Sequence, residues 1–301
     1  MRKTWIAGMI AAAALAATTV CFAEENKEAV AFENSGITLS IPGEYAEKLV
    51  VEDAPEDGSL FKVSEKASIE AAKAQGVEYD GPGWLFSIGT VPEDEAHLMI
   101  CNDMSGAEIF AKDAENNYYV FYHPTDVRLV RENYDDPAEM EGWSQLNEWA
   151  ATVEDTLVAE NEGLTAAKFG NSEVEMALFK TVYGDANYTI STLEHGPLEP
   201  GDVDPMPFVE KLTTGVKYEY AEETEAPDGE YAVLTFPEEG TRFDFFFAEG
   251  GENFVRKVTG EGDDEFVMLY KATFEDGTTK ASEVMKEWYD AIMAAVGVAE
   301  E

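Results

Sequence analysis

Five strand-like segments separated by glycine-containing turns occupy the last third of the chain, and they limit its fold more than any other feature. The segments are rich in aromatic and β-branched residues, which favour strands. They are Val216 to Ala221, Tyr231 to Phe236, Arg242 to Phe247, Phe254 to Val258 and Phe266 to Phe274. The turns are Asp228-Gly229, Glu239-Gly240, Gly250-Gly251, Gly260 to Gly262 and Asp276-Gly277. Successive strands joined by such turns pair with their neighbours, so the pattern predicts an antiparallel meander.

An amphipathic helix is predicted after these strands, from Lys280 to Val296. Val284, Trp288 and Ile292 recur along one line of this segment, at the spacing of a helix face. This apolar face predicts that the helix packs against the sheet. In the preceding strand at 242–247, alternation directs Phe243, Phe245 and Phe247 to the core and places Arg242 beside Asp244.

Residues 36–132 are predicted to form an N-terminal lobe that mixes strands and helices. The expected strands are Ile37 to Ile41, Lys48 to Glu52, Leu60 to Val63, Trp84 to Val91, Ala107 to Ala111, Tyr118 to Tyr122 and Val127 to Arg131. The strands at 107–111 and 118–122 are expected to form a hairpin. Helices are expected from Ser64 to Gln75, ended by Gly76, and directly after Pro92.

Residues 133–195 are predicted to be a helical segment. Asp136-Pro137 starts the first helix, whose apolar stripe runs from Trp143 to Leu157, and a second helix runs from Ser172 to Tyr183. Four prolines and two glycines between Gly196 and Pro207 predict a linker, followed by the C-terminal sheet and helix at 208–301. The expected fold is α+β in two lobes.

The first 23 residues have the organisation of a cleavable signal peptide. Arg2 and Lys3 precede an apolar stretch that is short for a membrane span, and Cys21-Phe22-Ala23 has small residues at the positions that signal peptidase requires. We therefore expect a secreted protein with a polar lead-in at 24–35 and no membrane span after signal removal. Lipid attachment at Cys21 is the alternative, although Thr18-Thr19-Val20 lacks the residues that favour it.

The charge of the chain excludes nucleic acid as a partner. The formal net charge is −42, and removal of Arg2 and Lys3 with the signal peptide changes it to −44. Such a surface repels phosphate backbones, because their binding depends on lysine and arginine contacts. The same acidity favours solubility outside the cell and leaves divalent cations as a conceivable ligand.

No motif for a catalytic site, a metal site or a cofactor is found in the chain. Cys101, the one cysteine after signal removal, is flanked by apolar residues and is expected to be buried, and with His97 it provides only two of the ligands that zinc needs. The acidic turn that begins at Asp113 lacks the glycine and the closing glutamate of a calcium loop. No nucleophile elbow or glycine-rich phosphate loop is present.

The candidate ligand-binding residues are His123, Asp126, Arg128 and Arg131. Arginine is scarce, and two of the four arginines that remain after signal removal lie in this stretch. If 127–131 is a strand, Arg128 and Arg131 point to opposite faces, which disfavours a two-arginine anion clamp. Two roles are left for these arginines. Arg128 pairs with Asp126 in a structural role, or Arg128 or Arg131 binds an anionic ligand.

The stretch from Tyr118 to Arg128, which reads YYVFYHPTDVR, resembles a family of uncharacterised exported proteins and lipoproteins of Firmicutes. Similar stretches cover most of residues 36–296. They are Leu60 to Ala67, Gly83 to Ile88, Asp228 to Phe236, Phe243 to Phe247 and Trp288-Tyr289. The resemblance implies export and transfers no functional residue. Many relatives carry a lipid-anchored cysteine, from which the context of Cys21 departs.

These features favour an extracytoplasmic binding or interaction protein of unknown ligand or protein partner. A carboxylate-dependent hydrolase is the first alternative, because paired carboxylates cannot be recognised by spacing in a chain with 62 acidic residues. A surface protein that responds to divalent cations is the second alternative.

Overall fold

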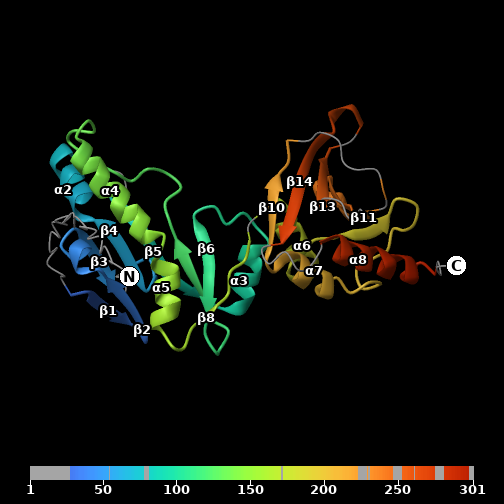
Figure 1. Cartoon of the computed structure of the whole chain (residues 1–301), viewed down its shortest axis with the longest axis horizontal. Helices are drawn as coiled ribbons and strands as arrows, with labels where there is room; N and C mark the ends of the chain where they lie inside the picture. Colours follow the sequence, from blue (N-terminus) through green and yellow to red (C-terminus); the bar gives the residue numbers. More distant parts are fainter. Residues whose placement is uncertain are drawn as a thin grey trace, which may run out of the picture.

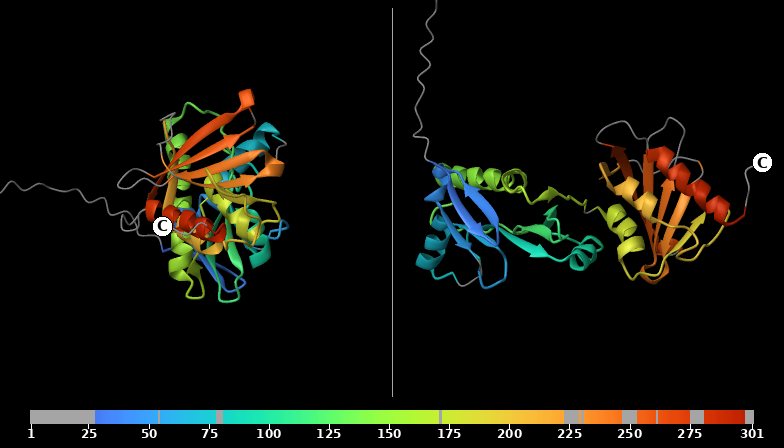
Figure 2. Two further views of the ribbon diagram at one scale, coloured as in Figure 1. Left: turned by 90° about the vertical axis from the view of Figure 1, so that its right-hand side faces the viewer. Right: turned by 90° about the horizontal axis from the view of Figure 1, so that it is seen from below.

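Two six-stranded sheets, each in its own lobe, lie side by side along the long axis of the molecule (Figure 1). The computed structural model describes residues 28–53, 55–77, 81–170, 172–222, 229, 231–246, 253–260, 262–274 and 281–297. The predicted signal peptide, including Cys21, lies outside these residues. The fold is α+β, as predicted. The view from below in Figure 2 (right) shows the same separation of the sheets.

The N-terminal sheet has the strand order β3-β4-β5-β7-β6-β8, with every neighbouring pair antiparallel. The strands are β3 (Leu49–Asp53), β4 (Phe61–Glu65), β5 (Trp84–Val91), β6 (Ala107–Lys112), β7 (Tyr118–Tyr122) and β8 (Thr165–Ala166). The predicted hairpin of β6 and β7 is confirmed. The helices α1 (Gly43–Ala46), α2 (Lys66–Gln75) and α3 (Glu93–Ile100) connect strands of this lobe. Gly76 ends α2 in the left-handed conformation, with φ 65°, as expected of a C-terminal glycine.

A separate hairpin of β1 (Val30–Asn34) and β2 (Ile37–Ile41) precedes this sheet. The prediction of a loose lead-in was therefore wrong for residues 30–34. Most side chains of β1 are exposed, so the apolar alternation that reveals a strand is missing from its sequence. Ser35 and Gly36 both have positive φ, which is the backbone of the tight turn that joins twisted antiparallel strands.

Side-chain alternation divides the N-terminal sheet between two cores. On β7, Tyr119 and Phe121 enter the core of the N-terminal lobe, where β2, α4 (Pro137–Ala150) and α5 (Val153–Glu160) pack. Tyr118 and Val120 point the other way, into a core that continues through α3 to the C-terminal lobe. The two lobes therefore share one apolar cluster on this face of the sheet.

The helical stripe predicted from Trp143 to Leu157 is divided between α4 and α5. The break falls at Ala151 and Thr152, where the chain leaves the α4 axis with Thr152 Oγ1 donating to the Trp149 carbonyl at 2.8 Å. Buried residues continue on both sides of the break, so the periodic pattern hides it. The change of direction allows α5 to lie against β2.

The C-terminal sheet has the order β10-β14-β13-β12-β11-β9 and is antiparallel throughout. Its strands are β9 (Thr189–Thr192), β10 (Val216–Tyr220), β11 (Tyr231–Phe236), β12 (Thr241–Phe246), β13 (Asn253–Thr259) and β14 (Phe266–Phe274). The meander is confirmed from β11 to β14. β10 departs from it, because β10 pairs with β14 at one edge while the unpredicted β9 pairs with β11 at the other.

Three helices pack into the core of the C-terminal lobe: α6 (Glu173–Tyr183), α7 (Met206–Thr213) and α8 (Ala281–Ala295), of which α7 contacts both α6 and α8. The N-terminus of α6 carries a capping box, in which Ser172 and Glu175 satisfy each other's backbone amides. The segment 196–207, expected to be a linker, connects β9 to α7 within this lobe, and Leu198 bridges back to Ile190. The chain passes between the lobes earlier, between β8 and α6.

A buried ion cluster lies on the sheet face opposite these helices. Asp244 is fully buried, and its carboxylate lies 3.0 Å from Arg242 Nε and 2.7 Å from Arg256 Nη2. The predicted pair of Arg242 with Asp244 is confirmed, and Arg256 is a further partner. Phe243 and Phe245 face the core as predicted, whereas Phe247 lies outside the described residues.

None of the helices among the described residues has the length and the apolar content that crossing a bilayer requires.

Candidate functional site

The four residues predicted to bind a ligand do not meet at one place. Residues 127–131 form no strand, contrary to the prediction, and the alternation argument for the two arginines therefore fails. Asp126 is exposed, Arg131 is buried, and His123 is half-exposed at the end of β7. The Arg128 carbonyl accepts a hydrogen bond from the Gly83 amide at 2.7 Å. The pairing of the Arg128 side chain with Asp126 stays a prediction.

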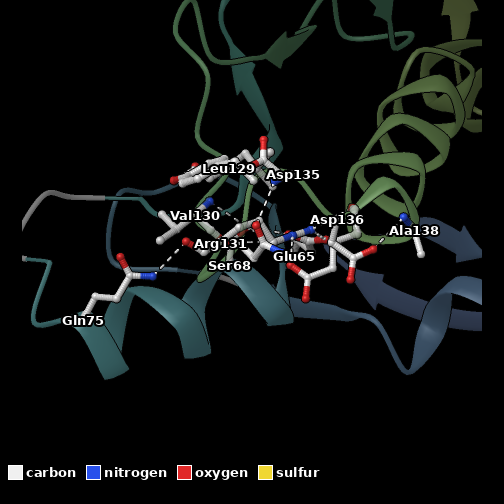
Figure 3. Close-up of polar contacts among 12 residues, drawn as sticks. Glu65, Ser68, Gln75, Leu129, Val130, Arg131, Asp135, Asp136 and Ala138 are labelled. Atoms are coloured by element: carbon white, nitrogen blue, oxygen red, sulfur yellow. Dashed lines mark hydrogen bonds and ion pairs between the residues drawn. The ribbon is translucent and has the colours of Figure 1, made fainter.

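Arg131 is the centre of a buried polar cluster at the start of α2 (Figure 3). Its Nη1 donates to Glu65 Oε2 at 2.8 Å and to Ser68 Oγ at 2.9 Å, and its Nη2 donates to Glu65 Oε1 at 2.5 Å. The Val130 amide also donates to Ser68 Oγ, at 3.1 Å. The cluster therefore ties the irregular segment before α4 to the junction of β4 and α2.

A groove with a volume of about 750 Å³ lies between α2 and α4, next to this cluster. Arg131 contributes to its lining, as do Glu65 and Glu139, whose Oε2 lies 3.4 Å from Arg131 Nε. Two carboxylates therefore already neutralise the guanidinium. An anionic ligand would have to compete with both of them, so the geometry favours a structural role for Arg131.

His123 lines a second cleft, which has a volume of about 420 Å³ and lies between the sheet and the helices α4 and α5. The walls combine apolar and polar side chains from elements far apart in the sequence. The lining residues are Leu85, Glu108, Phe121, His123, Pro124, Asn147, Ala150, Ala151, Glu154 and Lys168. A concave site with an apolar wall and a few convergent polar groups is the usual form of a small-molecule site.

Glu154 on α5 is the buried acid of this cleft. Its side chain is only 9% exposed, and its Oε2 lies 3.0 Å from Lys168 Nζ. Glu108 on β6 lines the same cleft, and its charge acts on the Glu154 carboxyl group. Glu108 Oε1 lies 3.6 Å from His123 Nε2, so two carboxyl groups, an imidazole and an ammonium group converge.

Burial raises the pKa of Glu154, because desolvation disfavours its charged form. The charge of Glu108 acts in the same direction, whereas Lys168 opposes both. The pKa of Lys168 is also raised, first by its hydrogen bond to Glu154.

Of the residues in this cleft, the sequence indicated only His123. Glu108 and Glu154 are separated by 46 positions and meet because α5 packs across the sheet. One signal was available: Glu154 follows the buried Ala150 by four positions, so it lies on the face of the helical stripe that turns toward the sheet. A carboxylate on a buried face is unusual enough to mark a site.

His97 lies on α3 and Cys101 at its end, as predicted. Cys101 is a buried free thiol, and burial raises its pKa to about 11. The His97 ring stacks on Tyr183 with 3.9 Å between centroids. Throughout the part of the chain that the structure describes, no three His, Cys, Asp or Glu side chains are grouped so that they could hold a metal ion.

Comparison of the chain with known protein families, with curated proteins and with solved structures found no match. The resemblance to exported Firmicutes proteins therefore stays a prediction.

Proposed function

We propose that this chain is an exported binding protein that holds a small polar ligand in the cleft formed by Glu108, His123 and Glu154. The observation that carries the proposal is the buried Glu154 carboxyl group at a concave, partly apolar surface. Burying an acid costs folding free energy, and a buried acid that lines a cleft is more typical of recognition than of stabilisation.

Two features of the sequence support an extracytoplasmic location for this activity. One is the signal-peptide pattern of residues 1–23, and the other is a net charge of −42, which favours solubility and disfavours adhesion to anionic surfaces. A ligand that enters this cleft meets a strongly negative protein. Neutral and cationic small molecules are therefore favoured over anions.

Thermal unfolding of the chain without residues 1–23 tests the proposal. The protein is screened against amines, carboxylic acids and neutral sugars at constant ionic strength. A ligand present at one hundred times its dissociation constant stabilises the native state by about 2.7 kcal/mol, so a binder raises the melting temperature by several degrees. We expect Glu154→Gln to abolish the shift and Glu160→Gln, an exposed site on the same helix, to retain it.

Two outcomes would contradict the proposal. One is that no class of ligand stabilises the protein. The other is that a stabilising ligand acts equally on the Glu154→Gln and Glu160→Gln proteins, because binding would then lie elsewhere.

A carboxylate-dependent hydrolase is the second candidate, and the two carboxyl groups of Glu108 and Glu154 in one cleft with His123 favour it. Two carboxyl groups in different environments can act as general acid and general base at one bond. The two functions are separated by the fate of the ligand. A binding protein returns it unchanged, whereas a hydrolase cleaves it at a rate that Glu154→Gln abolishes and Glu160→Gln preserves.

A further inference from the structure

The ammonium group of Lys168 indicates which chemistry the cleft accepts. Lys168 follows β8 on the connection to α6, and its side chain is 55% exposed. The Nζ atom lies 3.0 Å from Glu154 Oε2 and 3.2 Å from Asp155 Oδ1. A primary ammonium group thus already occupies the mouth of the cleft, on a long side chain that reaches in from solvent.

We propose that the ligand of this cleft is a small primary amine whose ammonium group takes the place of Lys168 on the Glu154 carboxylate. This inference rests on the proposed function and names the ligand class of the same site. An incoming ammonium group keeps the buried carboxylate paired, so Lys168 can leave without exposing an uncompensated charge. The displaced Lys168, already more than half exposed, extends into water.

The two ion pairs of Lys168 favour its replacement on Glu154 by the ammonium group of a ligand. The interaction of Lys168 with Asp155 is a surface ion pair, because the Asp155 side chain is 82% exposed, and such pairs contribute little to stability. Glu154 has the opposite character, since only 9% of its side chain is exposed. The buried carboxylate therefore needs a cation, but apart from this pair only the weak contact with Asp155 selects Lys168 as that cation.

The rest of the cleft suits the organic part of an amine. Leu85 and Phe121 are both buried and form an apolar wall, and Glu108 provides a second carboxyl group for the three N–H donors of an ammonium group. The volume of about 420 Å³ accommodates an alkyl chain of several carbons. A carboxylate ligand of the same shape would meet the two carboxyl groups of Glu108 and Glu154, and it could pair with Lys168 only by competing with Glu154 for that ammonium group.

Isothermal titration calorimetry of residues 24–301 with n-hexylammonium chloride tests the inference. Hexanoate, hexanol and tetramethylammonium are the comparison ligands at matched ionic strength. We expect n-hexylammonium to bind, and we expect Lys168→Met to increase its affinity about tenfold by removing the competing ammonium group. Lys211→Met is the matched control, because Lys211 forms a similar exposed ion pair, with Glu287, in the other lobe.

Lys168→Gln is a second variant, which keeps a hydrogen-bond donor near Glu154 while removing the charge. It preserves the test if Lys168→Met does not fold. Tighter binding of n-hexylammonium to either Lys168 variant, with none to Glu154→Gln, supports the inference. Weaker binding of tetramethylammonium, which has no N–H donor, supports recognition of a primary ammonium group.

Two results would overturn the inference while the proposed function stands. One is unchanged affinity for n-hexylammonium in both Lys168 variants, and the other is Glu154-dependent binding of hexanoate or hexanol in preference to the amine. If none of these compounds binds and the wider thermal screen is also negative, the proposed function fails together with the inference.

Discussion

Replacing Arg131 with methionine is expected to lower the free energy of unfolding by about 3–5 kcal/mol, which is the usual cost of breaking a buried ion pair on one side. The side chain of Arg131 is 4% exposed and that of Glu65 is 5% exposed. Without the guanidinium, the Glu65 carboxylate would remain buried with Ser68 as its hydrogen-bond donor. Chemical denaturation monitored by circular dichroism measures the loss.

The double variant Glu65→Met with Arg131→Met is the informative control. Removing both charges eliminates the unpaired carboxylate, so the double variant should be more stable than Arg131→Met alone. Arg242→Met is expected to cost less than Arg131→Met, because Arg256 still neutralises Asp244 in that variant. An Arg131→Met protein within 1 kcal/mol of the wild type would contradict the role of Arg131 as a buried brace.

Trp288→Ala is expected to destabilise the chain by about 3–5 kcal/mol, the range for truncating a buried aromatic residue. Trp288 is fully buried on α8, where its ring lies 5.8 Å from the Phe208 ring and 5.1 Å from the Phe245 ring. The substitution therefore opens a cavity between α7, α8 and the C-terminal sheet. Denaturant unfolding followed by far-ultraviolet circular dichroism measures the effect.

Trp288→Phe should lower the free energy of unfolding clearly less than Trp288→Ala does, because an aromatic ring remains. No hydrogen bond is lost either, since the indole Nε1 is buried without a hydrogen-bond partner. Glu287→Ala is the surface control on the same helix, since its ion pair with Lys211 is exposed and is expected to contribute at most about 1 kcal/mol. Equal costs for Trp288→Ala and Glu287→Ala would show that α8 does not pack on the sheet through Trp288.

The sequence predicted those parts of the fold in which local signals and packing agree. The strands from β11 to β14 have apolar alternation and glycine turns, and α8 has a continuous apolar face, so each could be located in advance. The place of β10 in the sheet could not be predicted, because nothing in its local sequence indicates which edge of the sheet it joins. β1 was missed because its exposed side chains lack alternation.

The segment 127–131 shows how a strand-like composition misleads. Its valines and leucine suggested alternation, yet Leu129 and Val130 are both buried while Val127 is 79% exposed. Consecutive buried residues are incompatible with a half-buried strand and fit an irregular segment that is held by Ser68 and Arg131. The scarcity of arginine drew attention to Arg131 as a ligand-binding candidate, but its partner Glu65 lies 66 positions earlier in the chain.

The candidate site was predictable only at His123. Its other polar groups come from β6, α5 and the segment after β8, and they converge only when α5 crosses the N-terminal sheet. In a chain with 62 acidic residues, no spacing rule distinguishes Glu108 from the rest. Burial distinguishes Glu154, whose side chain is 9% exposed, and this burial follows from the packing of the whole lobe.

A pH titration of the Glu154 carboxyl carbon by ¹³C NMR, with and without n-hexylammonium, tests the central claim most directly. In the free protein, burial and the neighbouring Glu108 should place the pKa of Glu154 above its ordinary value. A bound ammonium group takes the place of Lys168 on this carboxyl group, so the ligand should change the chemical shift of the Glu154 resonance. If Glu154 has an ordinary pKa and its resonance does not respond to the amine at any pH, the cleft is not a binding site for cations.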